Sequence, residues 1–467
     1  MTTTSVRPAP VRRGPAAGRD AALPVLVGGT VALLPILVPP GPGNTAVADV
    51  LMAGSVMVAA LWVTRERLPV AFPYAAGVTL LMVGGALGAT VSGAPVSTAL
   101  VLAQDVFLLL WAATLALSRY DPAILAAATT TWCRVAVVYS GIVIMAYIIG
   151  FAPLSGVTAK DGVRAAYTFG DPNLAGNYLV TSLFLMAACK RPRADSTRRV
   201  GYVLVLVAIG FTGSNGAMLT LLIGSVSCLT ITAFRRRGTQ AGVVTMVMSV
   251  TIAAFLVGVV MPLVNFDTVR AQAASSVPLL RDSVGRSGSS SSERAIILDE
   301  GTHLFFQGNA IGLGPARTKT TLENTQAPYV KEAHNDYLAT LLERGLVGAI
   351  GLIVLIWSIA LRCGRLVTQQ LPEAYAAIVP RAWLLVAVAP VMAVGAGFYE
   401  VLHFRHLWTW LGIVAGLVLV LQDQQRARRW KLPDSAPERA PDRGPDRAPG
   451  RGPDRGPDGG PRPEEQS

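Results

Sequence analysis

The chain has little charge and few residues that could form a covalent cross-link or bind a metal. Only 15% of its 467 residues are charged, and it contains 4 cysteines and 4 histidines. The cysteines lie in or beside apolar segments and match no metal-site spacing, so we predict neither a disulfide framework nor a metal site. Apolar residues make up 52% of the chain, in long runs, which excludes a soluble domain with a single core.

Apolar runs separated by polar breaks recur along the chain. A helix needs roughly 20 apolar residues to cross a bilayer. The runs are 22–40, 45–63, 70–91, 97–118, 128–150, 173–189, 200–212, 215–234, 241–263, 345–361, 382–402 and 405–421. We therefore predict an all-α, polytopic membrane protein with about twelve transmembrane helices, of which the seventh is short and the fifth ambiguous.

Lys and Arg gather in alternate connections between these runs. The basic connections are the N-terminus, 65–67, Arg119, 190–199, 235–237 and 362–365, whereas the turns at 41–44, 92–95 and 213–214 carry neither residue. Cytoplasmic loops carry the positive excess, so both termini are predicted to be cytoplasmic. The predicted organisation is a cytoplasmic segment 1–21, spans one to nine in 22–263, a large external loop 264–340, spans ten to twelve in 341–421, and a cytoplasmic tail 422–467.

A net charge of +12 would also be compatible with a protein that binds nucleic acid. Much of this excess is explained by loop residues that set topology and meet anionic membrane lipids, so no nucleic-acid partner is predicted. The first span lacks a convincing small-residue cleavage site and is expected to stay as an anchor. From Pro433 onward, an imperfect Pro-Asp-Arg-(Gly/Ala) repeat with almost no apolar residues predicts disorder.

A polar block with a histidine, Ala333-His334-Asn335-Asp336-Tyr337-Leu338, runs directly into the tenth span. At the start of a helix, His334 would feel the positive end of the macrodipole, which keeps the imidazole neutral and able to accept a proton. The alternative is a capping or interfacial histidine without a chemical role. Spacing alone leaves both interpretations open.

The predicted external loop contains a second helical pattern. Apolar residues at Ile296, Ile297, Leu304 and Phe305 predict an amphipathic helix over 293–306 that lies on the membrane. Residues 309–315 predict a turn after it. In the tenth span, glycines at 345, 348 and 351 have the spacing that lets another helix approach closely, so we interpret them as packing residues.

Arginines are scarce on the predicted external face, and those present lie near span ends or in the loop. The ones we single out are Arg164, Arg294, Arg317 and Arg405. A guanidinium binds phosphate oxygens bidentately and stays charged at any relevant pH. Close to Arg164, Asp171-Pro172-Asn173 has the residues of a helix N-terminus. The arginines indicate an anionic substrate at the headgroup level.

These blocks together resemble the O-antigen ligase and polymerase superfamily over roughly residues 160–420. The His-Asn-x-x-Leu block before a span is the specific part of the resemblance. The other blocks are useful jointly, and they are Phe169-Gly-Asp-Pro-Asn173, Thr212-Gly-Ser-Asn215, Arg294 with Gly312-Leu-Gly314, and the later Glu343, Gly345 and Gly348.

The resemblance implies a GT-C-like glycosyltransferase in the plasma membrane of a bacterium. It would transfer a glycan from an undecaprenyl-diphosphate carrier to an acceptor hydroxyl of a glycan or lipid at the external face, without a metal or cofactor. His334 would be the general base or would orient the acceptor. Arg294 would hold the donor diphosphate, with Arg164, Arg405 and Asn335 as further substrate-binding residues.

One position departs from the family pattern, because many members carry Arg where this chain has Asn215. Either other arginines suffice or the donor differs. The resemblance does not distinguish a ligase from a polymerase. We favour a polymerase or generic glycan ligase over a strict O-antigen ligase. A shape-elongation-type peptidoglycan polymerase is disfavoured by the His-Asn block.

A different class of function is a transporter or flippase for a lipid-linked glycan or a small anion. It would use charged residues within the membrane, for which Asp105, Arg134 and Glu400 are candidates. Transporters usually show repeat symmetry between halves. The long external loop has no counterpart in the first half of this chain, which disfavours transport.

Overall fold

A computed structural model describes residues 21–38, 45–157, 163–255, 287–307, 310–324 and 335–431. The chain divides into two units, residues 1–424 and 425–467. Within the described ranges every regular element is a helix, which confirms the all-α prediction. The predicted disorder of the tail concerns residues outside these ranges, and so does His334.

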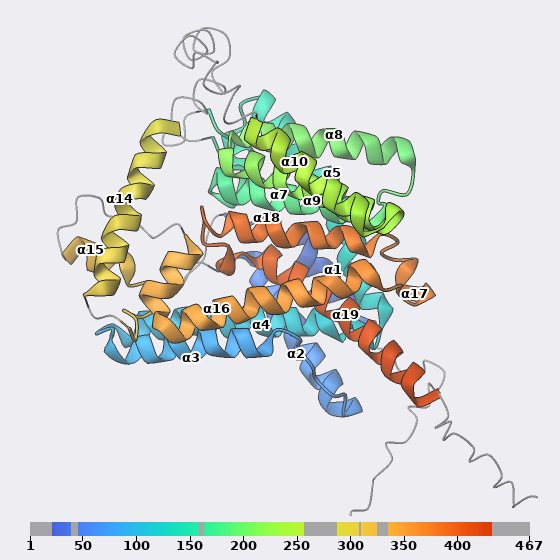
Figure 1. Ribbon diagram of the computed structural model, residues 1–467, viewed down its shortest axis with the longest axis horizontal. Helices are drawn as coiled ribbons and strands as arrows, with labels where there is room; N and C mark the ends of the chain where they lie inside the picture. The colour runs from blue at the N-terminus through green and yellow to red at the C-terminus, as the bar shows by residue number, and fades with distance from the viewer. Residues whose placement is uncertain are drawn as a thin grey trace, which may run out of the picture. The chain divides into compact units, whose positions relative to one another are not determined.

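The α-helices, in chain order (Figure 1), are α1 Ala22–Leu33, α2 Val47–Glu66, α3 Ala75–Val91, α4 Pro95–Ala116, α5 Pro122–Ile148, α6 Ala152–Ser155, α7 Pro172–Cys189, α8 Asp195–Thr212, α9 Asn215–Arg237, α10 Thr239–Phe255, α14 Ser287–Phe306, α15 Thr318–Asn324, α16 Asp336–Thr368, α17 Glu373–Ala376, α18 Val388–Gly395 and α19 Arg405–Lys431. Short 3-10 helices are η2 Leu117–Arg119, η3 Tyr167–Phe169, η5 Ala382–Ala387 and η6 Val401–His403.

Each of the twelve predicted apolar segments coincides with helical structure. Among the described residues, six helices are long and apolar enough to cross a membrane, and these are α2, α4 extended to Arg119, α5, α9, α16 and α19. The segment 382–402 is divided into η5, α18 and the start of η6, with Pro390 inside it. Helicity of the segments is thus confirmed, while the count of twelve spans stays a prediction.

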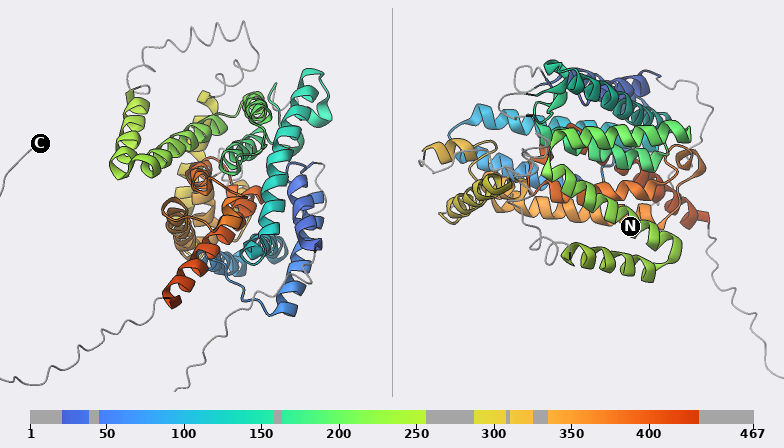
Figure 2. Two further views of the ribbon diagram at one scale, coloured as in Figure 1. Left: turned by 90° about the vertical axis from the view of Figure 1, so that its right-hand side faces the viewer. Right: turned by 90° about the horizontal axis from the view of Figure 1, so that it is seen from above.

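The last helix, α19, lies at the centre of the bundle. In its most apolar stretch, 89% of the residues are buried inside the protein, compared with 17% in the corresponding stretch of α9. The indole N–H of Trp111 on α4 donates to Thr409 at 2.9 Å, and that of Trp410 donates to the carbonyl of Leu385 at 3.1 Å. By contrast, α10 packs on α9 at the edge of the bundle (Figure 2) and exposes most of its apolar side chains. Such exposure is expected of helices that face lipid.

Helix α16 packs along α3, and glycines permit the close approach (Figure 1). A Cβ built on Gly84 would lie 2.5 Å from the backbone nitrogen of Gly348, and one on Gly351 would lie 2.6 Å from that of Leu81. Side chains at these positions would therefore push the two helices apart. The predicted packing role is confirmed for Gly351. A Cβ on Gly348 would meet Arg344 of its own helix at 2.3 Å, although its backbone lies against Gly84 of α3.

Gly345 has a different role, and its assignment as a helix-packing residue was wrong. Its φ of 62° and ψ of −164° interrupt the helical backbone inside α16. The turn that begins at Ala310 enters at this break, where the N–H of Leu346 donates to the Ala310 carbonyl at 2.9 Å. Three glycines at helical spacing look alike in the sequence, but only this one has a left-handed φ.

An ion pair that the sequence did not reveal lies next to this break. The guanidinium of Arg344 on α16 donates to the carboxylate of Asp105 on α4 at 2.6 Å, and both residues are 7% exposed. Buried ion pairs fix the register of two elements more than they add net stability, because desolvation offsets the attraction. Asp105, a candidate charge for transport, therefore has a structural partner.

We expect Gly345→Ala to destabilise the protein and Gly364→Ala, in the same helix, to leave it nearly unchanged. A Cβ at position 345 would meet the Ala310 carbonyl oxygen at 2.4 Å in a left-handed conformation, whereas one at 364 meets nothing within 4 Å. Such backbone strain costs on the order of 1–3 kcal/mol. Thermal unfolding in detergent measures both effects, and equal midpoints for the two variants would contradict the assigned break.

Candidate active site

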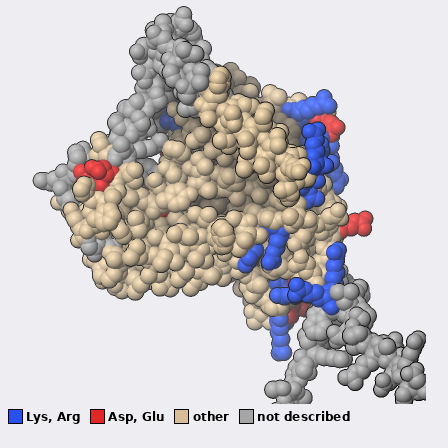
Figure 3. Space-filling model, viewed as in Figure 1, with Lys and Arg blue, Asp and Glu red and all other residues tan. Residues whose placement is uncertain are grey.

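Several polar helix starts lie at one end of the bundle. The starts of α7, α9 and α16 and the end of α18 lie on the left of Figure 1. Lys and Arg gather on the right of the same view, over the start of α8 and the end of α9, while little charge of either sign is visible over the centre of the face (Figure 3). The candidate site residues and the basic loops therefore belong to opposite ends of the helices.

Arg164 connects two sequence blocks that are far apart in the chain. Its Nε donates to the carbonyl of Thr212 at 3.0 Å, and its Nη2 donates to the side-chain carbonyl of Asn173 at 2.9 Å. Arg164 is half-buried. This arrangement holds a fixed positive charge between the start of α7 and the connection of α8 to α9.

The loop that carries Arg164 is anchored by Tyr167, which has an unusual φ of 52°. Its hydroxyl donates to the carbonyl of Ala208 on α8 at 2.8 Å. Burial raises the pKa of Tyr167, so the phenol keeps its proton and remains a donor. The strained backbone is held by packing, and strain of this kind is frequent at functional sites.

Ser214 extends the cluster to the C-terminal part of the chain. Its hydroxyl donates to Asn173 at 2.9 Å and lies 3.4 Å from the hydroxyl of the buried Tyr399. It also accepts from the N–H of Ala217 at 3.2 Å, which makes it the N-cap of α9. A Cβ on Gly216 would lie 2.2 Å from the Tyr399 hydroxyl, so the glycine leaves room for Tyr399.

The two predicted helix starts are present and capped by their own side chains. Asp171 accepts from the N–H groups of Asn173 and Leu174 at 2.6 and 3.0 Å, as the sequence predicted. Asn335 accepts from the N–H groups of Tyr337 and Leu338 at 2.9 and 3.2 Å. Because its side-chain carbonyl is used as a cap, the shown role of Asn335 is structural, and substrate binding stays a prediction.

Asp336 attaches the start of α16 to the connection between α18 and α19. Its N–H donates to the carbonyl of Ala396 at 2.8 Å, and its carboxylate accepts from the N–H of Leu402 at 3.1 Å. The Tyr337 hydroxyl donates to the carbonyl of Ala393 at 2.7 Å. Tyr399 lies in this same connection, so the blocks around Asn173, Ser214 and Asp336 all meet segment 393–402.

The glycine-containing turn 310–315 is bound to α16 as well. The N–H of Leu313 donates to the Leu342 carbonyl at 2.8 Å, and that of Gly314 donates to the Glu343 carbonyl at 3.0 Å. The Glu343 carboxylate accepts from the N–H of Ala316 and the hydroxyl of Thr318, each at 2.8 Å. Glu343 therefore caps α15 and ties it to the helix that follows the histidine block.

The helix predicted over 293–306 exists as part of α14 and is longer than expected, while its amphipathic character and its place on the membrane stay predictions. Ile297 and Leu304 are buried against Leu338 and Leu342 of α16, whereas Ile296 is 38% exposed. Arg294 belongs to this helix, but its side chain lies outside the described part of the structure. His334 lies outside the described residues too, although its neighbour Asn335 is placed at the cluster.

Arg405, the remaining predicted substrate-binding arginine, is engaged by a carboxylate. Its Nε and Nη2 donate to the two oxygens of Asp49 on α2 at 2.6 and 2.5 Å. Next to it, the buried His406 ring lies 2.8 Å from the side-chain carbonyl of Asn177. The sequence pattern indicated neither contact, because the partners are distant in the chain.

Helix and site together define a polytopic helical membrane protein with a polar site at one end of its helices. Residues 200–353 match the model of the O-antigen ligase family, which confirms the resemblance seen in the sequence. The match covers about a third of the chain and contains Ser214, α14 and the histidine block. A comparison with curated proteins gives no match.

We expect Asp336→Ala to destabilise the protein by about 1–3 kcal/mol, because it leaves the N–H of the half-buried Leu402 without its acceptor. Asp336→Asn retains a carbonyl oxygen and is expected to keep most of this stability. Thermal unfolding of the two variants in the same detergent measures the difference. Equal losses would show that the carboxylate acts through its charge and not as the acceptor described here.

Proposed function

We propose that the protein is a glycosyltransferase of the bacterial plasma membrane. It transfers or polymerises a glycan from an undecaprenyl-diphosphate carrier onto an acceptor hydroxyl at the external face. The observation that carries this proposal is the convergence of Arg164, Asn173, Ser214 and Tyr399 beside the start of the histidine-block helix. The O-antigen ligase family match over 200–353 supports the same class of reaction.

The external placement of the site follows from charge. Lys and Arg gather at the other end of the helices (Figure 3), and the basic end of a membrane protein faces the cytoplasm. On this basis the N- and C-termini are cytoplasmic. The cluster around Arg164 then lies at the outer headgroup level, where the diphosphate of a carrier lipid would reside.

The donor side of the reaction is assigned to Arg164 first and to Arg294 second. When the glycan leaves its carrier, the diphosphate keeps the bonding electron pair and needs charge stabilisation more than a proton. Arg164 is fixed by Thr212 and Asn173, so it requires little reorganisation to provide that stabilisation. Arg405 ranks below it because Asp49 already occupies its guanidinium.

The position of Arg164 also offers an answer to the departure at Asn215. Because Arg164 donates to the carbonyl of Thr212, its guanidinium lies beside the Thr212-Gly-Ser-Asn215 block. The cation that many family members carry within this block is thus supplied from another segment. We assign the diphosphate-facing charge of this site to Arg164 on that ground.

The acceptor side is assigned to His334, which directly precedes Asn335, the N-cap of α16. A helix N-terminus disfavours imidazolium, so the neutral ring can take the proton of the acceptor hydroxyl. As that oxygen bonds to the anomeric carbon, the bond from this carbon to the diphosphate breaks. Positioned general bases typically contribute roughly a hundred- to ten-thousand-fold to such steps.

Transport would require charges that act within the membrane, and one of its three candidates, Asp105, has an ion-pair partner, while a second, Glu400, lies beside a histidine. Asp105 pairs with Arg344 at 2.6 Å, and Glu400 lies 3.7 Å from His403. These contacts give Asp105 and Glu400 structural roles. No feature of the described residues favours transport over transfer.

His334→Ala is expected to lower glycan transfer by about a hundred- to ten-thousand-fold, because the acceptor hydroxyl loses its base. The assay uses reconstituted protein with an undecaprenyl-diphosphate glycan and measures both the transferred glycan and the released carrier diphosphate. His303→Ala is the matched control, since His303 is an exposed residue of α14. Full activity of the His334 variant would contradict the assignment of His334 as the base. Vectorial transport without glycan transfer would contradict the proposed enzymatic function.

Arg164→Ala is expected to weaken donor use strongly, and Asn215→Arg in the same chain is expected to restore part of it. The rescue follows because position 215 would return a guanidinium to the block that Arg164 contacts. Transfer rates at several donor concentrations measure the effect, with Arg317→Ala as a control for loss of another arginine on the predicted external face. An inert Arg164→Ala, or a rescue of equal size from Asn215→Gln, contradicts the phosphate-binding role.

A further inference from the structure

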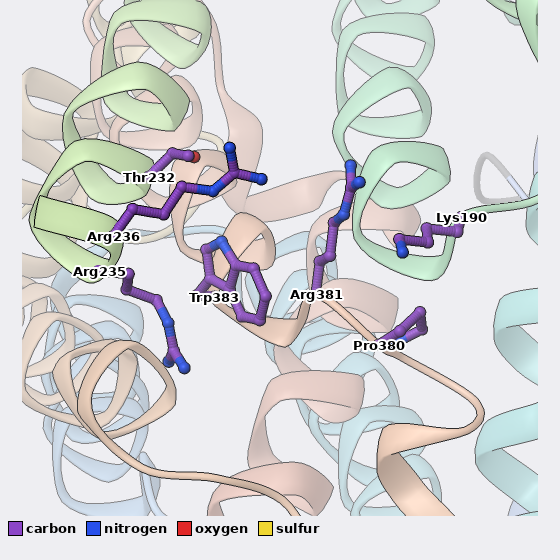
Figure 4. Close-up of a pocket in the computed structure, with 7 residues that line it drawn as sticks. All are labelled: Lys190, Thr232, Arg235, Arg236, Pro380, Arg381 and Trp383. Carbon is purple, nitrogen blue, oxygen red and sulfur yellow. The ribbon is translucent and has the colours of Figure 1, made fainter.

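A cavity of about 290 Å³ lies at the basic end of the helices, away from the candidate active site. It is formed by three segments: the end of α7 with Lys190, the last turns of α9 with Thr232, Arg235 and Arg236, and the chain before and within η5 with Arg381 and Trp383. In Figure 4, Trp383 stands between the arginines of α9 and Arg381, and the amino group of Lys190 points toward Arg381. The four cations therefore border one space.

The fold fixes the side chain of Arg235 and the backbone of Arg381. The guanidinium of Arg235 stacks on Trp383 at 4.3 Å from the ring centre and donates to the carbonyl of Val367 at the end of α16. The backbone N–H of Arg381 donates to the carbonyl of Ala188 on α7 at 3.0 Å, and Ala188 lies two positions before Lys190 in the chain. Two independent attachments thus join the segments that border the cavity.

The charge of the cavity has one sign. In the part of the chain that the structure describes, no carboxylate lines it, and its four cations form none of the recorded ion pairs. Like charges brought together this closely repel one another unless an anion shares the space. Guanidinium and ammonium donors in such an arrangement suit a phosphate group.

The location and the volume of the cavity limit the class of ligand that it could bind. A volume of about 290 Å³ lies at the lower end of ligand pockets, roughly 300–1,000 Å³, which suits a headgroup better than an oligosaccharide. α9 is a candidate span that ends in Arg235, Arg236 and Arg237, and Trp with basic residues marks the headgroup level. Basic pockets between membrane helices on the cytoplasmic side bind anionic headgroups.

We propose that this cavity binds the phosphate headgroup of an anionic phospholipid in the leaflet at the basic end. The lipid phosphate is bound by Arg236, Arg381 and Lys190, while Arg235 and Trp383 form the wall between α9 and the chain around η5. The bound headgroup would join α7, α9 and the chain around η5. In the sequence, η5 is followed by α18 and then by the segment 393–402 of the candidate active site. Membrane topology requires only that the loops carry positive charge, whereas here four cations also border a cavity.

The test titrates the full-length protein in detergent with phosphatidylglycerol and with phosphatidylcholine, and counts bound lipid by native mass spectrometry. Arg236→Gln with Arg381→Gln is expected to weaken phosphatidylglycerol binding about tenfold or more. The matched control is Arg193→Gln with Arg199→Gln, which removes the same charge from exposed residues nearby. Arg236→Lys with Arg381→Lys retains the charge and is expected to retain most of the binding.

A third arm adds inorganic phosphate, and at millimolar concentration it is expected to leave phosphatidylglycerol bound. Lys190→Gln, at an exposed position, is expected to weaken binding about fivefold and serves if the double variant is unstable. The proposal is overturned if the double variant at the cavity and the control double variant lose phosphatidylglycerol binding equally. That result would show that the lipid binds through diffuse surface charge. Displacement of the lipid by free phosphate overturns the assignment to a headgroup.

Discussion

The candidate site depends on the attachment of one helix start to one connection. Asp336 is 2% exposed, and its amide and carboxylate both bond to the segment between α18 and α19. A carboxylate buried at a membrane-facing site is costly unless hydrogen bonds satisfy it. The position of α16 is therefore coupled to Tyr399, and through Tyr399 to Ser214 and Asn173. The start of α16, which follows His334 in the sequence, is therefore a fixed point in this network.

The rest of the fold supports this attachment by holding α16 in register. Glycines let α16 lie close to α3, and the Arg344–Asp105 pair joins it to α4. The break at Gly345 admits the turn 310–315, and Glu343 caps α15, which follows that turn. None of these contacts touches a substrate in the proposed mechanism. Each limits the movement of the segment that carries the histidine block, and a base must be positioned before its proton affinity matters.

Local chemistry could be predicted from the sequence, and long-range contacts could not. Apolar runs located all twelve helical segments, and Asp171 was recognised as a cap because capping depends on residues two or three positions away. The partners of Arg164, Arg344 and Tyr399 lie tens to hundreds of residues away, and no period in the sequence indicates which helices are neighbours. Gly345 was misassigned because spacing does not reveal a backbone angle.

The central claim is that the carrier diphosphate binds at the cluster of Arg164, Asn173, Ser214 and Tyr399, with the acceptor-activating block beside it. The most direct measurement is an electron cryomicroscopy structure of the full-length protein with bound undecaprenyl diphosphate. We predict diphosphate density within hydrogen-bond distance of Arg164, on the side of the cluster that faces the start of α16. Diphosphate density at the opposite, basic end of the helices, with the Arg164 cluster empty, would contradict the account.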